Sequence, residues 1–236
     1  PSTLKSTCDM TASILQSCRS VRHIVSLALI LSLCRSSPGQ EEMLYPVSLA
    51  VHDGTVFVAD LNLPGIWKSS DKGTEKFYAG SAKFRTPLNR VRCVAIDQDG
   101  RLLAGDSSTR EIYRFDAEGK PQPLTDGGIG IPMGIAVRKN GEILVSDLEL
   151  HCIWKVPSDG GKPEHLATVP SPAGICLDGE DRLWVLSRGK VPLRRVSTDG
   201  DGDVAVTEVV KERTFSFPHN VVVDAAGNVF LTDGYS

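Results

Sequence analysis

Three aspartates in the segment TDGDGD have a spacing that could bind a metal ion. Asp199, Asp201 and Asp203 stand at alternate positions, as at the start of a calcium-binding loop, where carboxylate oxygens are the ligands. An EF-hand loop also needs a central Gly and a bidentate Glu, whereas the twelfth position here is Val210. The aspartates are therefore a candidate metal site, and a polar turn between two strands is the alternative.

Four arginines could bind an anion instead. They are Arg92, Arg110, Arg188 and Arg213. Guanidinium groups pair with carboxylate or sulfate in a bidentate fashion. If the four lie on one solvent cavity, the expected partner is an anionic ligand, an acidic saccharide or an acidic loop of another protein. The alternative is that each arginine is only solvated.

A repeated phrase decides where these residues lie. In PMGIAVRKNGEILVSD, residues 132–147, two apolar runs flank the turn signal Asn-Gly, which is typical of a β-hairpin. Related phrases recur at intervals of about 40 to 46 residues, a period typical of solenoids and propellers. Four of the five phrases end in an aspartate: Asp60, Asp106, Asp147 and Asp233. We expect these carboxylates to be structural and to accept hydrogen bonds from backbone N–H groups of the following loop.

Each repeat contains about four short strand patterns without helical periodicity, which predicts an all-β fold with one four-stranded blade per repeat. Residues 132–155 nearly match the phrase Pro-x-Gly-Ile-Ala-Val-Asp-x-x-Gly-x-Leu-x-Val-x-Asp followed by Ile-x-Lys/Arg, so the chain resembles the NHL-repeat family. The resemblance covers residues 46–236 and implies a β-propeller, usually of six blades, of which about four and a half are expected here. The fold alone does not specify an activity.

Propeller topology then places residues from several repeats around the mouth of the central channel. The residue after the first position of each phrase should line this mouth: Val47, Arg92, Met133, Ala173 and His219. Arg110, His151, Arg188 and Arg213 fall in loops expected on the same face. Bases outnumber acids in those loops, whereas the opposite turns are rich in Asp, so the mouth is expected to attract anions.

Two enzymatic resemblances are the alternative to a binding protein. Gluconolactonase- and regucalcin-like propellers carry Asn or Asp at the mouth and hold a divalent cation through oxygen ligands. An NHL-type lyase holds zinc with mouth histidines, and His219 in FPHNVVVD resembles such a position. One His cannot make a three-ligand site. We therefore expect no catalysis and no cofactor, with a divalent cation only if further ligands lie in blades beyond this sequence.

Composition limits the other classes of function. The chain has 236 residues, 41% of them hydrophobic, and a formal net charge of −3, so it can form a sizeable core and no nucleic-acid partner is expected. Cys93, Cys152 and Cys176 lie in different repeats without a C-x-x-C motif, which favours small buried side chains over a disulfide framework.

The first forty residues differ from the repeats. Basic residues in RSVRH precede an uncharged apolar run, Ile24 to Cys34, and a polar segment follows it. This order is typical of a secretory signal peptide, and the run is too short to span a bilayer comfortably. We predict an upstream segment with a signal peptide over residues 1–40, a C-terminally truncated propeller over 41–236, no membrane span, and a secreted or periplasmic, bacterial location. An N-terminal helix packed on the propeller, or a lipoprotein anchor at Cys34, is the alternative.

Overall fold

The computed structural model describes residues 42–62, 65–198 and 203–234. All of the regular structure in these ranges is β-strand. The predicted signal segment, residues 1–40, lies outside the described residues, as do Asp199 and Asp201. No helix that could cross a bilayer occurs in the described part of the chain.

The described strands form four antiparallel sheets of four strands and one of two strands. We call each sheet a blade. Blade 1 contains β1 (Pro46–His52), β2 (Thr55–Asp60), β3 (Gly65–Ser70) and β4 (Gly73–Ala79). Blade 2 contains β5 (Val91–Ile96), β6 (Leu102–Asp106), β7 (Glu111–Phe115) and β8 (Pro121–Pro123). Blade 3 contains β9 (Pro132–Val137), β10 (Ile143–Asp147), β11 (Cys152–Val156) and β12 (Glu164–Thr168). Blade 4 contains β13 (Pro172–Leu177), β14 (Leu183–Ser187), β15 (Leu193–Thr198) and β16 (Val204–Val210). Blade 5 contains β17 (Pro218–Val223) and β18 (Val229–Asp233).

The five repeated phrases become the first two strands of the five blades. In blade 3, for example, β9 and β10 pair in antiparallel register, with Val137 opposite Ile143. Gly141 closes their turn with φ +88°, a conformation that favours glycine. The prediction of four strands per repeat is confirmed in blades 1 to 4, and blade 5 has two strands in the described part of the chain.

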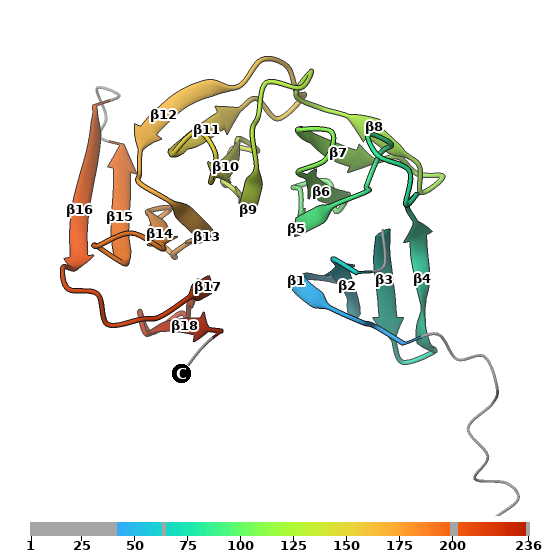
Figure 1. The fold of residues 1–236 in the computed structure, drawn as a ribbon, viewed down its shortest axis with the longest axis horizontal. Helices are drawn as coiled ribbons and strands as arrows, with labels where there is room; N and C mark the ends of the chain where they lie inside the picture. Colours follow the sequence, from blue (N-terminus) through green and yellow to red (C-terminus); the bar gives the residue numbers. More distant parts are fainter. Residues whose placement is uncertain (1–41, 63–64, 199–202, 235–236) are drawn as a thin grey trace, which may run out of the picture. The chain divides into compact units, whose positions relative to one another are not determined.

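First strands of successive blades pack beside one another, in the order β1, β5, β9, β13 and β17. Figure 1 shows these strands on the inside, with the later strands of each blade further out. Each first strand begins at the end that we call the mouth and runs to a hairpin turn at the opposite end. The residues at its beginning are therefore positioned around the channel mouth.

Apolar residues fill the spaces between neighbouring blades. Four buried clusters alternate with the blades; between blades 3 and 4, for example, Leu144 and Ile153 pack with Leu183 and Val185. The middle strands β6, β10 and β14 are buried along their whole length. Because blades 2, 3 and 4 are buried on both faces, each of these three blades is a layer of the core.

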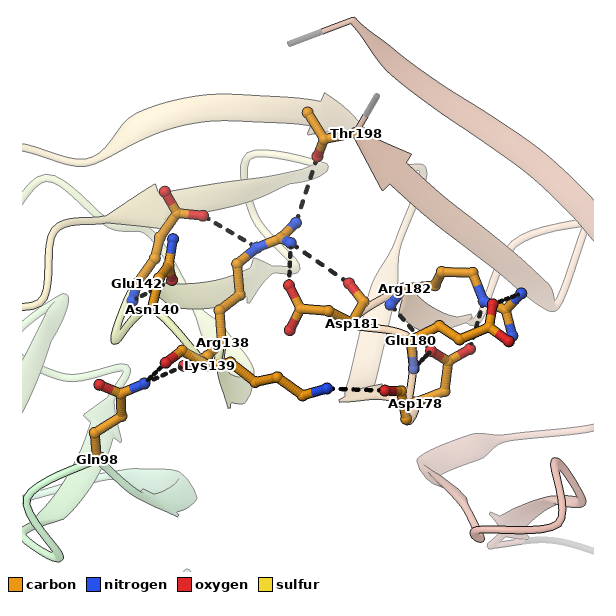
Figure 2. A network of polar contacts seen from close by, with 11 residues as sticks. Gln98, Arg138, Lys139, Asn140, Glu142, Asp178, Glu180, Asp181, Arg182 and Thr198 are labelled. Atoms are coloured by element: carbon orange, nitrogen blue, oxygen red, sulfur yellow. Dashed lines mark hydrogen bonds and ion pairs between the residues drawn. The ribbon is translucent and has the colours of Figure 1, made fainter. Parts of the chain in front are cut away.

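The hairpin turns far from the mouth are joined by polar contacts between blades. Figure 2 shows the turn of blade 3, where Arg138 Nη1 pairs with Asp181 Oδ2 of blade 4 at 2.6 Å and Lys139 Nζ donates to the Gly179 carbonyl at 2.9 Å. Gln98 of blade 2 donates to the carbonyl of Arg138 at 3.1 Å. Blades 2, 3 and 4 are thus linked in sequence at this end.

Candidate functional site

A small hollow of about 160 Å³ lies at the mouth. We call it the mouth hollow; its lining comes from blades 1 to 5. The lining residues are Tyr45, Val47, Leu61, Arg92, Met133, Arg188, Phe217, His219 and Asn220. Two guanidinium groups therefore share one concave surface with apolar side chains.

Arg92 reaches the hollow from the start of β5. Its Nε donates to Ser107 Oγ at 3.0 Å. Ser107 is itself fixed, because its backbone N–H and its hydroxyl both donate to the Arg90 carbonyl, at 3.1 and 3.2 Å. Ser107, in the loop after β6, thus holds Arg92 through Nε. The two terminal amino groups of Arg92 do not take part in this bond and can donate to a ligand in the hollow.

Arg188 enters from the residue directly after β14. Its guanidinium carbon lies 4.1 Å from the centre of the Phe217 ring, a cation–π contact with blade 5. Arg188 Nε donates to the Pro218 carbonyl at 3.4 Å, and Nη2 lies 3.4 Å from Nδ1 of His219. Three contacts from blade 5 therefore position this side chain.

Arg92 is close enough to Arg188 to lower the pKa of the Arg188 guanidinium. Burial lowers the pKa of Arg92, and nearby Arg90 lowers it further. Burial likewise lowers the pKa of Arg188, and the charge of Arg92 adds to that effect. Among the residues that the structure describes, no carboxylate pairs with either guanidinium, and none lines the hollow. Half-buried positive charge without a counterion favours an anion at this place.

His219 contributes its imidazole ring to the same wall. Burial lowers its pKa, and Arg188 lowers it further, while Asp233 acts in the opposite direction. Next to it, Asn220 Nδ2 donates to the Val47 carbonyl at 3.2 Å and so joins β17 to β1 across the mouth. His219 and Asn220 thus close the side of the hollow between blades 5 and 1.

The lining does not fit a divalent cation. Such ions need several carboxylate or carbonyl oxygens, or in the case of zinc several imidazole or thiolate ligands. Here one imidazole stands beside two guanidinium groups. In residues 42–62, 65–198 and 203–234, no group of three or more His, Cys, Asp and Glu side chains could hold a metal. Of the predicted aspartate site, only Asp203 is described, and it is exposed.

The structure brings together part of the predicted site. Arg92, Met133, Arg188 and His219 line the mouth hollow, with Val47. Ala173 does not, because it is completely buried in β13. The prediction of a five-residue ring is thus wrong at this position, where a methyl group is too short to extend past the packed first strands.

The prediction that four arginines share one cavity is also wrong. Arg110 does not line the mouth hollow; its Nη2 pairs with Glu149 Oε1 at 2.6 Å, between the loops of blades 2 and 3. Arg213 is exposed and donates to the nearby Ser216 carbonyl at 3.3 Å. His151 is exposed as well, and its Nδ1 accepts the backbone N–H of Ser171 at 3.0 Å. Each of these side chains has a hydrogen-bond partner that lies outside the lining of the hollow.

The strand-end aspartates hold the chain that leads into blades 1, 2, 3 and 5. Asp147 accepts backbone N–H groups from Gly130 at 2.7 Å and Ile131 at 3.0 Å, as well as from the loop that follows it. Equivalent bonds reach Asp60 from Leu44 and Tyr45, Asp106 from Asn89 and Arg90, and Asp233 from Ser216 and Phe217. The bonds to the preceding segment were not predicted, and they fix the residues just before the first strands of these blades at the mouth.

Four lining residues were missed by the sequence analysis: Tyr45, Leu61, Phe217 and Asn220. Tyr45 and Phe217 each precede the proline that opens a phrase, so this position was a usable signal. Leu61 directly follows a strand-end aspartate. Asn220 stands where the phrases of blades 3 and 4 have Gly134 and Gly174.

Known sequences match only part of this chain. No protein-family model matches the chain. A stretch of 65 residues is 40% identical to the human E3 ubiquitin-protein ligase TRIM32, and it covers 26% of this chain and 10% of the human protein. The mouse protein of the same name is 38% identical over 65 residues. The chain thus spans about a tenth of the length of these curated relatives, and the predicted bacterial origin finds no support in these two mammalian matches.

Solved structures match over most of the chain. A gluconolactonase from Xanthomonas campestris aligns with a TM-score of 0.70 and 19% identity, over 82% of this chain and 71% of that one. This chain is a β-propeller. A streptogramin B lyase matches with a TM-score of 0.65 and 18% identity, over 83% of this propeller and 64% of the lyase. A propeller in a nidogen/laminin complex matches with a TM-score of 0.64 and 21% identity, over 80% of this chain and 72% of that one. At such identities the likeness shows the fold alone.

Proposed function

We propose that this chain is an NHL-type propeller, of a six-bladed kind, that binds an anionic ligand or an acidic partner protein at its mouth without catalysing a reaction. The observation that carries this proposal is the pair Arg92 and Arg188, half-buried in one hollow without a carboxylate partner in the described part of the chain. The repeated phrase and the short TRIM32 match support the NHL assignment. The nidogen/laminin neighbour supports a protein as the partner class.

Anion binding is tested with a panel of simple salts. The full chain should be stabilised against heat by at least one of sulfate, phosphate and a carboxylate, in a saturable manner, because a ligand of the native state raises its stability by mass action. Substituting Arg92→Ala or Arg188→Ala should remove the effect. If none of these anions shifts the melting temperature beyond an equal ionic strength of chloride, the proposed function is wrong.

The second candidate is a metal-dependent lactonase or hydrolase, or a lyase. Its support is the structural similarity to a gluconolactonase and a streptogramin B lyase. Because the described mouth does not fit a divalent cation, this function would depend on ligands outside the described residues. Lactone hydrolysis by the full chain, abolished by a chelator and restored by a divalent salt, would favour this candidate over the binding protein.

We also propose export. The support is the order of a basic flank, an apolar run and a polar segment within residues 1–40. Expression of the full chain with a C-terminal reporter should yield a shortened product outside the cytoplasm. Retention of the full-length product inside the cell would contradict export.

A further inference from the structure

The free N–H groups in the mouth hollow point to one kind of anion. The Nε of Arg92 donates to Ser107, so both terminal amino groups of Arg92 can donate to a ligand. Arg188 has its Nε on the Pro218 carbonyl and Nη2 beside His219, which leaves Nη1 as its principal free donor. A pair of terminal amino groups from one arginine, with a further donor from a second, matches the two oxygens of a single carboxylate.

Part of the remaining wall is apolar, and this part disfavours an anion that is polar on all sides; Tyr45, His219 and Asn220 are the polar members of the lining. Val47, Leu61 and Met133 line the hollow and offer no side-chain hydrogen-bond donor. Sulfate and phosphate present oxygens in every direction, so the oxygens that face Val47, Leu61 and Met133 would lose water without gaining a partner. Burying an unpaired polar atom is unfavourable, because its hydrogen bonds to water are lost and not replaced. A carboxylate has oxygens at one end and carbon at the other, which suits donors combined with an apolar wall.

The volume limits the size of the ligand. The hollow measures about 160 Å³. An apolar cavity of about 150 Å³ in another protein accommodates benzene. A carboxylic acid with a short apolar or aromatic body therefore fits, whereas an extended saccharide would lie mostly outside.

We infer that the mouth hollow is a subsite for the carboxylate of a small organic acid, with Arg92 and Arg188 as its anchors and Met133, Leu61 and Val47 against its apolar body. This inference rests on the proposed function and narrows its ligand class. Ser107 is a positioning residue, since it acts on the ligand only through Arg92. The aromatic ring of Phe217 has the same role for Arg188.

The test is a titration of the full chain with sodium benzoate, benzamide, inorganic phosphate and a hexa-glutamate peptide, measured by calorimetry and by melting temperature. Benzoate should bind at one site. Benzamide has nearly the same shape without the charge and should bind at least tenfold more weakly. Arg92→Ala and Arg188→Ala should each weaken benzoate binding at least tenfold. Arg85→Ala is the matched control, because Arg85 also lies over a phenylalanine ring, that of Phe84, but outside the hollow.

The substitution Ser107→Ala tests the inference without removing an arginine, in case an arginine variant does not fold. It should weaken benzoate binding several-fold at an unchanged melting temperature of the free protein, and Ser107→Thr should restore the affinity. Phosphate binding without benzoate binding would overturn the carboxylate inference and leave the anion site of the proposed function standing. Tighter binding of the peptide than of benzoate would overturn the small acid in favour of a protein partner. Absence of binding by every anion would overturn both proposals.

Discussion

Arg188 of blade 4 lies over the ring of Phe217 of blade 5, with 4.1 Å between the guanidinium carbon and the ring centre. The same arginine lines the mouth hollow. One side chain therefore connects the packing of two blades with the surface that we propose as the binding site.

Replacing Phe217 by Leu should lower the free energy of unfolding by about 0.5–2 kcal/mol, because the cation–π contact with a half-buried guanidinium is lost. The measurement is urea denaturation. Phe84→Leu is the control, since Phe84 is 72% exposed and its ring centre is 5.5 Å from Arg85. Equal effects of the two substitutions would show that the Arg188 contact adds nothing.

Asp147→Asn should destabilise the protein by roughly 1–3 kcal/mol, since the amide nitrogen of Asn cannot accept the bonds that a buried carboxylate oxygen receives. Asp147 accepts the Trp154 indole N–H at 2.8 Å in addition to backbone N–H groups. Asp116, which is less buried than Asp147 and accepts Lys120 N–H at 2.8 Å beside the β7–β8 turn, provides the control Asp116→Asn. Urea midpoints that move equally would contradict a structural role specific to the strand-end aspartates.

Acid stability should depend on Asp178. Burial raises its pKa, but bonds from the Trp184 indole and from Arg182 outweigh this and lower the pKa to about 2. The pKa of an unfolded aspartate is about 3.9, so the stabilisation is complete above pH 4 and is lost as the pH falls through about 2. Between these values the unfolding free energy of Asp178→Asn should fall less steeply than that of the parent. Parallel pH profiles would refute the assignment.

Gly174→Ala should destabilise the packing of blade 5 on blade 4. A Cβ at this position would lie 2.6 Å from Asn220 Cα and 2.7 Å from the His219 carbonyl oxygen. Overpacking of this kind typically costs 1–3 kcal/mol, so the unfolding midpoint in urea should fall. Gly179→Ala is the control, because a Cβ there would meet no atom within 4 Å. If both variants unfold at the parent midpoint, β17 does not pack as closely as described.

Self-association should depend on exposed apolar side chains in blades 1 and 5. Leu49 and Val51 are 65% and 58% exposed, and Val222 and Phe230, which are opposite each other in β17 and β18, are 57% and 56% exposed. Exposed apolar strand residues favour association between copies. The double variant Leu49→Lys, Val222→Lys should scatter less light at equal concentration. Unchanged scattering would indicate that other surfaces drive association.

Sequence alone predicted the parts of the site that follow from strand register. Arg92, Met133 and His219 are the second residues of first strands, and topology places that position at the mouth. The loop residues were harder to predict because a loop side chain is directed by its partners. Arg188 lines the mouth hollow, whereas the pairing of Arg110 with Glu149 depends on the spacing between two blades. A repeat pattern contains no information about that spacing.

The burial of each position could not be predicted from the sequence either. Ala173 has the same register as Met133, yet it is fully buried. Asp147 was expected to bond the loop after it, but the bonds from Gly130 and Ile131 come from a segment that precedes its blade. These contacts arise only when the entry and exit of a blade meet in space.

Because each blade packs chiefly on the blades before and after it in sequence, the protein resembles a one-dimensional array of coupled units. A unit with two neighbours is held by two interfaces, and a unit at either end of the described array by one. Fraying should therefore begin in blades 1 and 5 and advance inward, so that amide exchange with deuterium is slowest in β10 and fastest in β18. The proposed ligand site includes residues of both end blades, and ligand binding should consequently slow exchange most where the array is weakest.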